Sequence, residues 1–162
     1  VRGKTDLIIL SGGVSEGDSD FIPSILEQMG FTLHLTRSAI QPGKPIIFAR
    51  RESQFCFGLA GNPVSSFVQF EFYVKPFLYK LMGFYYQIPS TWATMGGHYT
   101  RDRTERLKFI PAWLDPDHVV TPVEYHGSAH IEALGRANCL MDIPLGMAEI
   151  KKGDRVHVRP LR

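Results

Sequence analysis

Two short glycine-containing segments carry the residues best suited to binding an anion. Ser11-Gly12-Gly13 follows an apolar run, and Gly61-Asn62-Pro63 stands between another apolar run and a long helical pattern. At the carboxyl edge of a sheet such turns present backbone N–H groups, and a helix N-terminus adds a partial positive charge. We therefore expect the two turns to bind phosphate or another oxyanion. The alternative is that these glycines serve only the backbone freedom that tight turns need.

A basic segment lies between the two turns in the sequence. Arg37, Gln41 and Lys44 fall on or just after a predicted strand, and neighbouring proline and glycine residues restrict the backbone that carries Lys44. A cation held at a fixed place would strengthen the attraction of the turns for an anion. The alternative is that Arg37 and Lys44 are ordinary solvated charges, as most such residues are.

Three acidic residues follow the first glycine turn: Glu16, Asp18 and Asp20. Carboxylates beside a phosphate-binding turn are suitable ligands for Mg²⁺. Asp20 is equally suited to cap a following helix, which needs no metal. His126 and His130 form a separate polar loop without a third ligand at a spacing typical of zinc, so a surface loop is favoured there.

The apolar pattern predicts an α/β unit that positions these turns. Strands are expected at 6–10, 33–40, 46–49 and 55–59, and helices at 20–29 and 62–82. The continuous apolar character of residues 6–10 indicates a strand buried on both faces. Asn62 is a suitable N-cap and Pro63 a suitable first helical residue, with a kink expected near Pro76 and a stop at Gly83.

From Phe84 onward the helical spacing ends and short alternating runs begin. Strands are expected at 92–99, 107–114, 119–125, 139–143 and 156–158. About five short strands are typical of a small barrel or sandwich. The predicted organisation is therefore an α/β domain over residues 1–84, a linker over 85–90 and a small β domain over 91–162.

Composition excludes several classes of partner. The chain has 162 residues, 44% hydrophobic, and a net charge of +2 from 18 basic and 16 acidic residues. This balance gives no general footprint for nucleic acid, and no run approaches the roughly 20 apolar residues that span a bilayer. We expect neither a nucleic-acid nor a membrane partner. Two cysteines without a CxxC motif favour a reducing, cytoplasmic location, and the missing initiator Met suggests a piece of a longer protein.

Three blocks of the sequence resemble, in order and spacing, the MoeA/gephyrin family of molybdopterin molybdenumtransferases. They are DLIILSGGVSEGDSD at 6–20, AIQPGKP at 39–45 and GLAGNPVS at 58–65. Residues 138–160 resemble the closing strands of that family's C-terminal β domain. The resemblance implies half of a mostly parallel, molybdopterin-binding-type α/β domain followed by a small C-terminal β-barrel or sandwich.

The resemblance also implies a function. Such enzymes bind adenylylated molybdopterin and molybdate, hydrolyse the adenylate with Mg²⁺ and leave molybdenum on the dithiolene. A homodimer is implied, with the site between the α/β domain of one subunit and the β domain of the other. The catalytic positions would be Asp20, Lys44 and Arg37, with Asp20 also holding the metal. The substrate-binding positions would be Ser11, Gly12, Gly13, Gln41, Gly61, Asn62, Pro63, Ser65, Lys108 and Ser128.

The sequence departs from the family pattern at three of these positions. Gln41 and Arg37 stand where lysine is usual or common, and Lys108 where arginine is usual. A neutral Gln41 removes one charge, and lysine cannot make the bidentate contact of arginine with an oxyanion. Because the first half of the α/β domain is also expected to be absent, we expect this chain alone to lack full turnover. A non-catalytic scaffold or a regulatory oxyanion-binding module remains the alternative.

A second alternative is a different enzyme built on the same molybdopterin-binding fold. A cofactor adenylyltransferase and a CinA-like hydrolase are two such enzymes, and both lack an appended β domain. The strands predicted over residues 91–162 therefore argue against this alternative.

Overall fold

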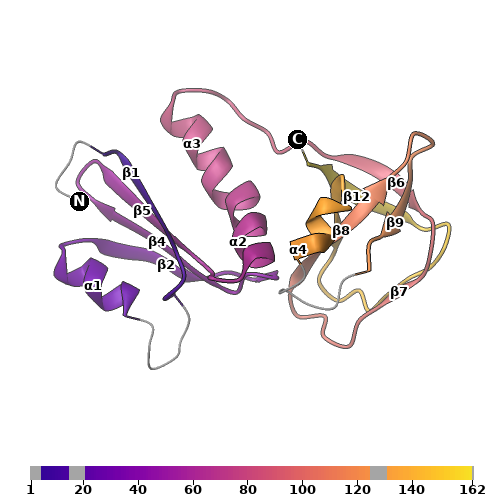
Figure 1. Cartoon of the computed structure of the whole chain (residues 1–162), viewed down its shortest axis with the longest axis horizontal. Helices are drawn as coiled ribbons and strands as arrows, with labels where there is room; N and C mark the ends of the chain where they lie inside the picture. Colours follow the sequence, from indigo (N-terminus) through magenta and orange to yellow (C-terminus); the bar gives the residue numbers. More distant parts are fainter. Residues whose placement is uncertain (1–4, 15–20, 125–130, 162) are drawn as a thin grey trace.

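The computed structural model describes residues 5–14, 21–124 and 131–161. Its first part is a four-stranded sheet with helices on both faces: α1 covers one face and the helical column that begins with α2 covers the other (Figure 1). The elements of this part are β1 (Leu7–Ser11), α1 (Ile22–Gln28), β2 (Thr32–Arg37), β4 (Pro45–Arg51), β5 (Gln54–Leu59), α2 (Pro63–Gln69), the π-helical turn η1 (Phe70–Val74) and α3 (Lys75–Leu81).

Alternation along β4 explains the two helical layers. Ile47 and Ala49 pack in the cluster beneath α1, whereas Ile46 and Phe48 pack in the cluster beneath the α2 column. Successive side chains of a strand point to opposite faces of the sheet, so one strand supplies both cores. The predicted α/β class is confirmed, and the core of this domain is divided by its sheet.

The predicted sheet differs from the structure in its strand directions. The strand order is β1-β5-β4-β2, in which β1 pairs with β5 in parallel while the other two pairs are antiparallel, so this sheet is mixed and not mostly parallel. The first strand was expected to be buried on both faces; within the described residues it pairs with β5 alone, and Ile9 is 44% exposed.

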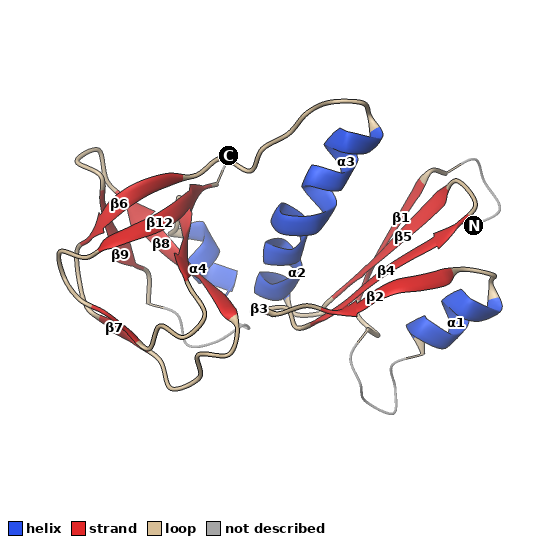
Figure 2. Cartoon of the chain, turned by 180° about the vertical axis from the view of Figure 1, so that it is seen from behind, coloured by secondary structure: helices blue, strands red, loops and turns tan. Residues whose placement is uncertain are grey.

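The predicted strand 33–40 is broken in the structure. β2 ends at Arg37, and Ser38 turns the chain by donating from its N–H to the Lys44 carbonyl at 2.8 Å and from its hydroxyl to the Gly43 carbonyl at 3.1 Å. The next strand, β3 (Ile40–Gln41), leaves this sheet and pairs in parallel with β8 of the second domain (Figure 2).

The long helix begins as predicted, and it changes geometry before the expected kink. Asn62 is the N-cap and Pro63 the first residue of α2. The helix widens at η1, where the N–H of Lys75 bonds to the Phe70 carbonyl five residues back. Pro76 is the second residue of α3, which follows η1, and a proline cannot donate to the preceding turn. The stop at Gly83 is confirmed, because this residue has φ of +83°, which suits glycine.

At the start of α1, Phe21 occupies the N-cap position and makes no side-chain cap. Asp20, the predicted cap, lies outside the described ranges. Of the expected apolar face of the long helix, Leu81 is 41% exposed and lies outside the core.

The second domain is a closed barrel of the predicted size. Its strands are β6 (Thr91–Met95), β8 (Leu107–Leu114), β9 (Val119–Pro122), β10 (Cys139–Ile143) and β12 (Arg155–Pro160), in the order β10-β12-β6-β9-β8. Pairing of β10 with β8 closes the ring of strands, so the second domain is a barrel and not a sandwich. A short helix α4 (Ile131–Gly135) and the ribbon of β7 (Tyr99–Thr100) with β11 (Glu149–Ile150) were not predicted.

No helix in the described ranges is long and apolar enough to cross a membrane.

Both cysteine thiols are buried, and we predict that they are unreactive in the native chain. Burial raises the pKa of Cys56 to about 11 and that of Cys139 to about 12, from an ordinary 9.0. Because the thiolate is the nucleophile, iodoacetamide at pH 8 should label neither residue until the chain unfolds. The raised pKa values also mean that the contribution of the two buried thiols to stability is fully present below pH 9 and is lost as the pH rises above it, because the thiols of the unfolded chain ionise first. Mass spectrometry of native and urea-unfolded samples checks the labelling, and native labelling at the unfolded rate would contradict it.

Candidate functional site

The two glycine turns meet at one edge of the first sheet. β1 and β5 are adjacent and parallel, so the turns that follow them lie together. The N–H of Gly12 donates to the Leu59 carbonyl at 2.9 Å. A Cβ on Gly61 would lie only 3.3 Å from the Gly12 Cα, which shows how closely the two backbones approach. The convergence expected from the sequence is present, and the missing side chain at Gly61 permits it.

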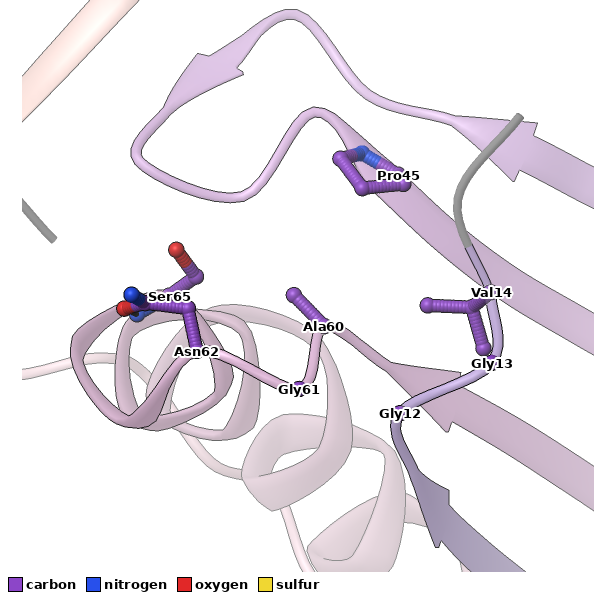
Figure 3. A pocket seen from close by; sticks show the side chains of 8 residues that line it. All are labelled: Gly12, Gly13, Val14, Pro45, Ala60, Gly61, Asn62 and Ser65. Atoms are coloured by element: carbon purple, nitrogen blue, oxygen red, sulfur yellow. Dashed lines mark hydrogen bonds between the residues drawn. The ribbon is translucent and has the colours of Figure 1, made fainter. Parts of the chain in front are cut away.

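A pocket of about 350 Å³ opens beside this contact. The turns form one wall, the start of α2 lies at one end, and Pro45 faces them from the other wall (Figure 3). The lining residues are Gly12, Gly13, Val14, Pro45, Ala60, Gly61, Asn62 and Ser65. Five of the predicted substrate-binding residues therefore share one cavity: Gly12, Gly13, Gly61, Asn62 and Ser65.

The pocket wall offers backbone donors. Asn62 accepts hydrogen bonds at its Oδ1 from the amides of Val64 and Ser65, at 3.2 and 3.3 Å, so these helix-end donors are already used. Within the described ranges, the N–H groups of Gly13, Gly61 and Asn62 donate to no protein acceptor. Unpaired amides beside a positive helix end form a site suited to an oxyanion.

The basic segment lies next to the pocket without lining it. Pro45 forms the wall, and the preceding Lys44 has an exposed side chain. Arg37, also exposed, lies opposite Pro45 in the register of β2 and β4. The backbones of both residues therefore adjoin Pro45 of the pocket wall, and side chains of this length could reach an anion bound there.

Other predicted residues lie farther from the cavity. Ser11 ends β1 and directs its hydroxyl to the Ala60 carbonyl at 3.4 Å. Gln41 lies beside Lys108 in the pairing of β3 with β8. The Lys108 ammonium sits 5.4 Å from the centre of the Tyr99 ring. Pro63 is exposed at the start of α2 and does not line the cavity.

Two predicted site residues, Asp20 and Ser128, lie outside the described ranges, as do the candidate metal ligands Glu16, Asp18, His126 and His130. Among the described residues, no three His, Cys, Asp or Glu side chains come together to hold a metal ion. The described residues that line the pocket include no carboxylate.

One residue beside the pocket, Gln69, was not predicted from the sequence. Gln69, fully buried on α2, accepts at Oε1 from the Ala60 N–H and donates from Nε2 to the carbonyls of Gly43 and Pro45. It thus contacts both sides of the pocket. The signal that could have found it is an uncharged polar residue on the buried face of a helix otherwise occupied by apolar side chains.

Comparison with known families matches both halves of the chain. Residues 1–80 match the model of a probable molybdopterin binding domain, and residues 97–161 match the MoeA C-terminal region (domain IV). The two matches follow each other in the order in which the structure places the sheet domain and the barrel.

Similar proteins carry related names. A molybdopterin molybdenumtransferase of Haemophilus influenzae is 31% identical over 170 residues, which cover 98% of this chain and 40% of that protein. The molybdenum cofactor synthesis protein cinnamon of Drosophila melanogaster is 52% identical over 71 residues, 44% of this chain and 12% of that protein. The chain thus spans two fifths or less of the length of these relatives.

The fold has solved counterparts as well. The molybdopterin biosynthesis MoeA protein of Pyrococcus horikoshii superposes with a TM-score of 0.79 at 26% identity, over 97% of this chain and 37% of that one. A molybdenum cofactor biosynthesis protein of Pyrococcus furiosus gives 0.73 at 20% identity, over 98% of this chain and 69% of that one, which concerns the fold alone. With both domains matched in order, the chain belongs to the MoeA family of molybdenum cofactor biosynthesis proteins and corresponds to its C-terminal part.

Proposed function

We propose that this chain supplies the oxyanion-binding part of a molybdopterin molybdenumtransferase. The substrates proposed are adenylylated molybdopterin and molybdate, and the reaction is insertion of molybdenum with hydrolysis of the adenylate. The observation that carries the proposal is the pocket lined by Gly13, Gly61 and Asn62, whose backbone N–H groups donate to no acceptor among the described residues. A phosphate group and molybdate share a tetrahedral arrangement of charged oxygens, which such amides bind.

The chemistry assigned to the described residues is electrostatic. The amides would donate to the oxygens of the phosphate or molybdate, and Lys44 and Arg37 would offset charge at the opening. Donors held in place before the substrate arrives stabilise the charge that develops as the phosphate bond breaks. No nucleophilic side chain is needed, because water attacks the adenylate and adenosine monophosphate leaves.

Mg²⁺ and a second subunit are further parts of the proposal. The described lining does not fit a metal ion, since it contains no carboxylate, so no step is assigned to Mg²⁺. The metal is proposed on the resemblance alone, with Asp20 as its ligand. A cytoplasmic homodimer, with Lys108 and Ser128 of one copy facing the pocket of the other, is proposed on the same basis.

A non-catalytic oxyanion-binding module is the second candidate. The uncharged Gln41 favours it, because the segment that leads to Lys44 carries less positive charge than the family pattern expects. Full turnover by the 162-residue chain would exclude this candidate. Binding of molybdate without any turnover in a protein of full family length would favour it.

Calorimetric titration of the chain with sodium molybdate and with inorganic phosphate tests the proposal. We expect saturable binding that weakens as ionic strength rises. Lys44→Ala should weaken it roughly tenfold, the effect of losing one charge-assisted hydrogen bond. Lys152→Ala, which removes an exposed lysine from the turn between β11 and β12, is the control and should leave affinity unchanged. Equal losses in the two variants would reject a specific site.

A further inference from the structure

Gln69 joins the two walls of the pocket through a single side chain. Its Oε1 accepts from the Ala60 N–H at 2.8 Å, and its Nε2 donates to the Gly43 carbonyl at 2.9 Å and the Pro45 carbonyl at 2.6 Å. Ala60 and Pro45 both line the pocket. Every hydrogen bond that the structure gives this side chain therefore ends on the backbone of one wall or the other.

The opposite wall receives hydrogen bonds from Gln69 and from Ser38. The Gln69 carboxamide donates to the carbonyls of Gly43 and Pro45, and the Ser38 hydroxyl also donates to the Gly43 carbonyl at 3.1 Å. Buried carbonyls are expensive to leave without a donor, so Gln69 helps to hold the segment where its carboxamide reaches it.

Packing limits the segment as strictly as the hydrogen bonds do. A Cβ at Gly43 would lie 3.0 Å from the Gln69 Cγ, so the backbone rests directly on the aliphatic part of the side chain. Gly43 has φ of +106°, a conformation that suits glycine. Because a carboxamide is planar, the spacing between the Ala60 amide and the two carbonyls is set by one rigid group.

We propose that Gln69 is a positioning residue: it sets the separation of the two pocket walls and thereby the affinity of the pocket for tetrahedral oxyanions. It touches no ligand itself and acts through the backbones of Ala60 and Pro45. The inference rests on the proposed function for the nature of the ligand, and it adds the residue on which the fit of that ligand depends.

Two substitutions separate the hydrogen bonds from the volume. Gln69→Met keeps a long unbranched side chain in the helix and removes all three hydrogen bonds, whereas Gln69→Ala also leaves a void. The matched control is Asn138→Ala, because the Asn138 side chain clamps backbone in the same way within the barrel, accepting from the Leu114 N–H at 2.7 Å and donating to its carbonyl at 2.8 Å.

Two measurements are made on the 162-residue chain and its variants. Titration with inorganic phosphate and molybdate should show a roughly tenfold or larger loss of affinity in Gln69→Met, and less than a twofold change in Asn138→Ala. Amide hydrogen exchange should become at least tenfold faster at Ala60 in Gln69→Met, with no change at Met141 of β10. Asn138→Ala should show the opposite pattern: the exchange rate should rise at Leu114 and stay unchanged at Ala60.

The outcomes separate the inference from the function on which it rests. Binding by the parent chain and equal binding by Gln69→Met would overturn the inference and leave the proposed function standing. No binding by the parent chain would overturn the proposed function and the affinity part of the inference, while local exchange at Ala60 would still support the positioning of the walls. Uniformly faster exchange in both domains of Gln69→Met would show a merely structural role and overturn the positioning.

Discussion

Replacing Phe109 with alanine is expected to lower the free energy of unfolding by about 4 kcal/mol. Phe109 is fully buried on β8 and packs in a cluster with Val68 of α2 and Leu140 of β10. Its ring centre lies 4.0 Å from that of Phe72 in η1. The substitution would therefore leave a cavity between the helix and the barrel, and small shifts of either element would not fill it.

Urea unfolding followed by circular dichroism measures this loss. Trp113→Ala is the matched control, since Trp113 is another aromatic residue of β8 but is 53% exposed. Its removal should change stability far less. A loss below about 1.5 kcal/mol for Phe109→Ala would mean that the cavity collapses and that the two domains do not depend on this contact.

The second large effect is expected at Asp142, where alanine should destabilise the chain by about 3 kcal/mol. This carboxylate is buried in the wall of the barrel. It accepts from the His157 Nδ1 at 2.7 Å and from two nitrogens of Arg159 at 2.9 to 3.1 Å. Removing the carboxylate leaves the half-buried Arg159 guanidinium without its acceptor. The cost of this unpaired charge is larger than the net contribution of the intact ion pair to stability.

The Arg159 guanidinium also lies 4.7 Å from the Phe72 ring, so its position matters to the contact between the helix and the barrel. Asp142→Asn, which keeps the shape and loses the charge, should fall between the parent chain and Asp142→Ala in the same unfolding experiment. The exposed pair of His98 with Glu149 provides the control, and Glu149→Ala should have a much smaller effect. Equal losses at Asp142 and Glu149 would contradict the role of burial.

The parts of the site that could be predicted from sequence are those with local causes. A glycine turn after an apolar run, and Asn62-Pro63 before a helical pattern, depend on a few adjacent residues. Their meeting was predictable because two parallel strands end at the same edge of a sheet. The resemblance to known blocks added Lys108 and Ser128, which local chemistry did not indicate, and their roles stay predictions.

The rest depends on partners distant in sequence. In its sequence neighbourhood, Gln69 is simply a polar residue that interrupts an apolar helical pattern. Only the fold brings Gly43 within its reach. From the sequence, Ile40 looks like the end of the strand that starts at residue 33 and Gln41 like the start of a loop, because nothing nearby reveals that their partner is β8.

The placement of β3 ties the two domains together mechanically. The segment that supplies Pro45 to the pocket starts in β3, bonded to the barrel strand β8, and ends in β4, within the first sheet. Only the short stretch 42–44 separates these two anchors. The position of Pro45 in the pocket wall is therefore fixed from two sides, by the barrel strand β8 and by the first sheet.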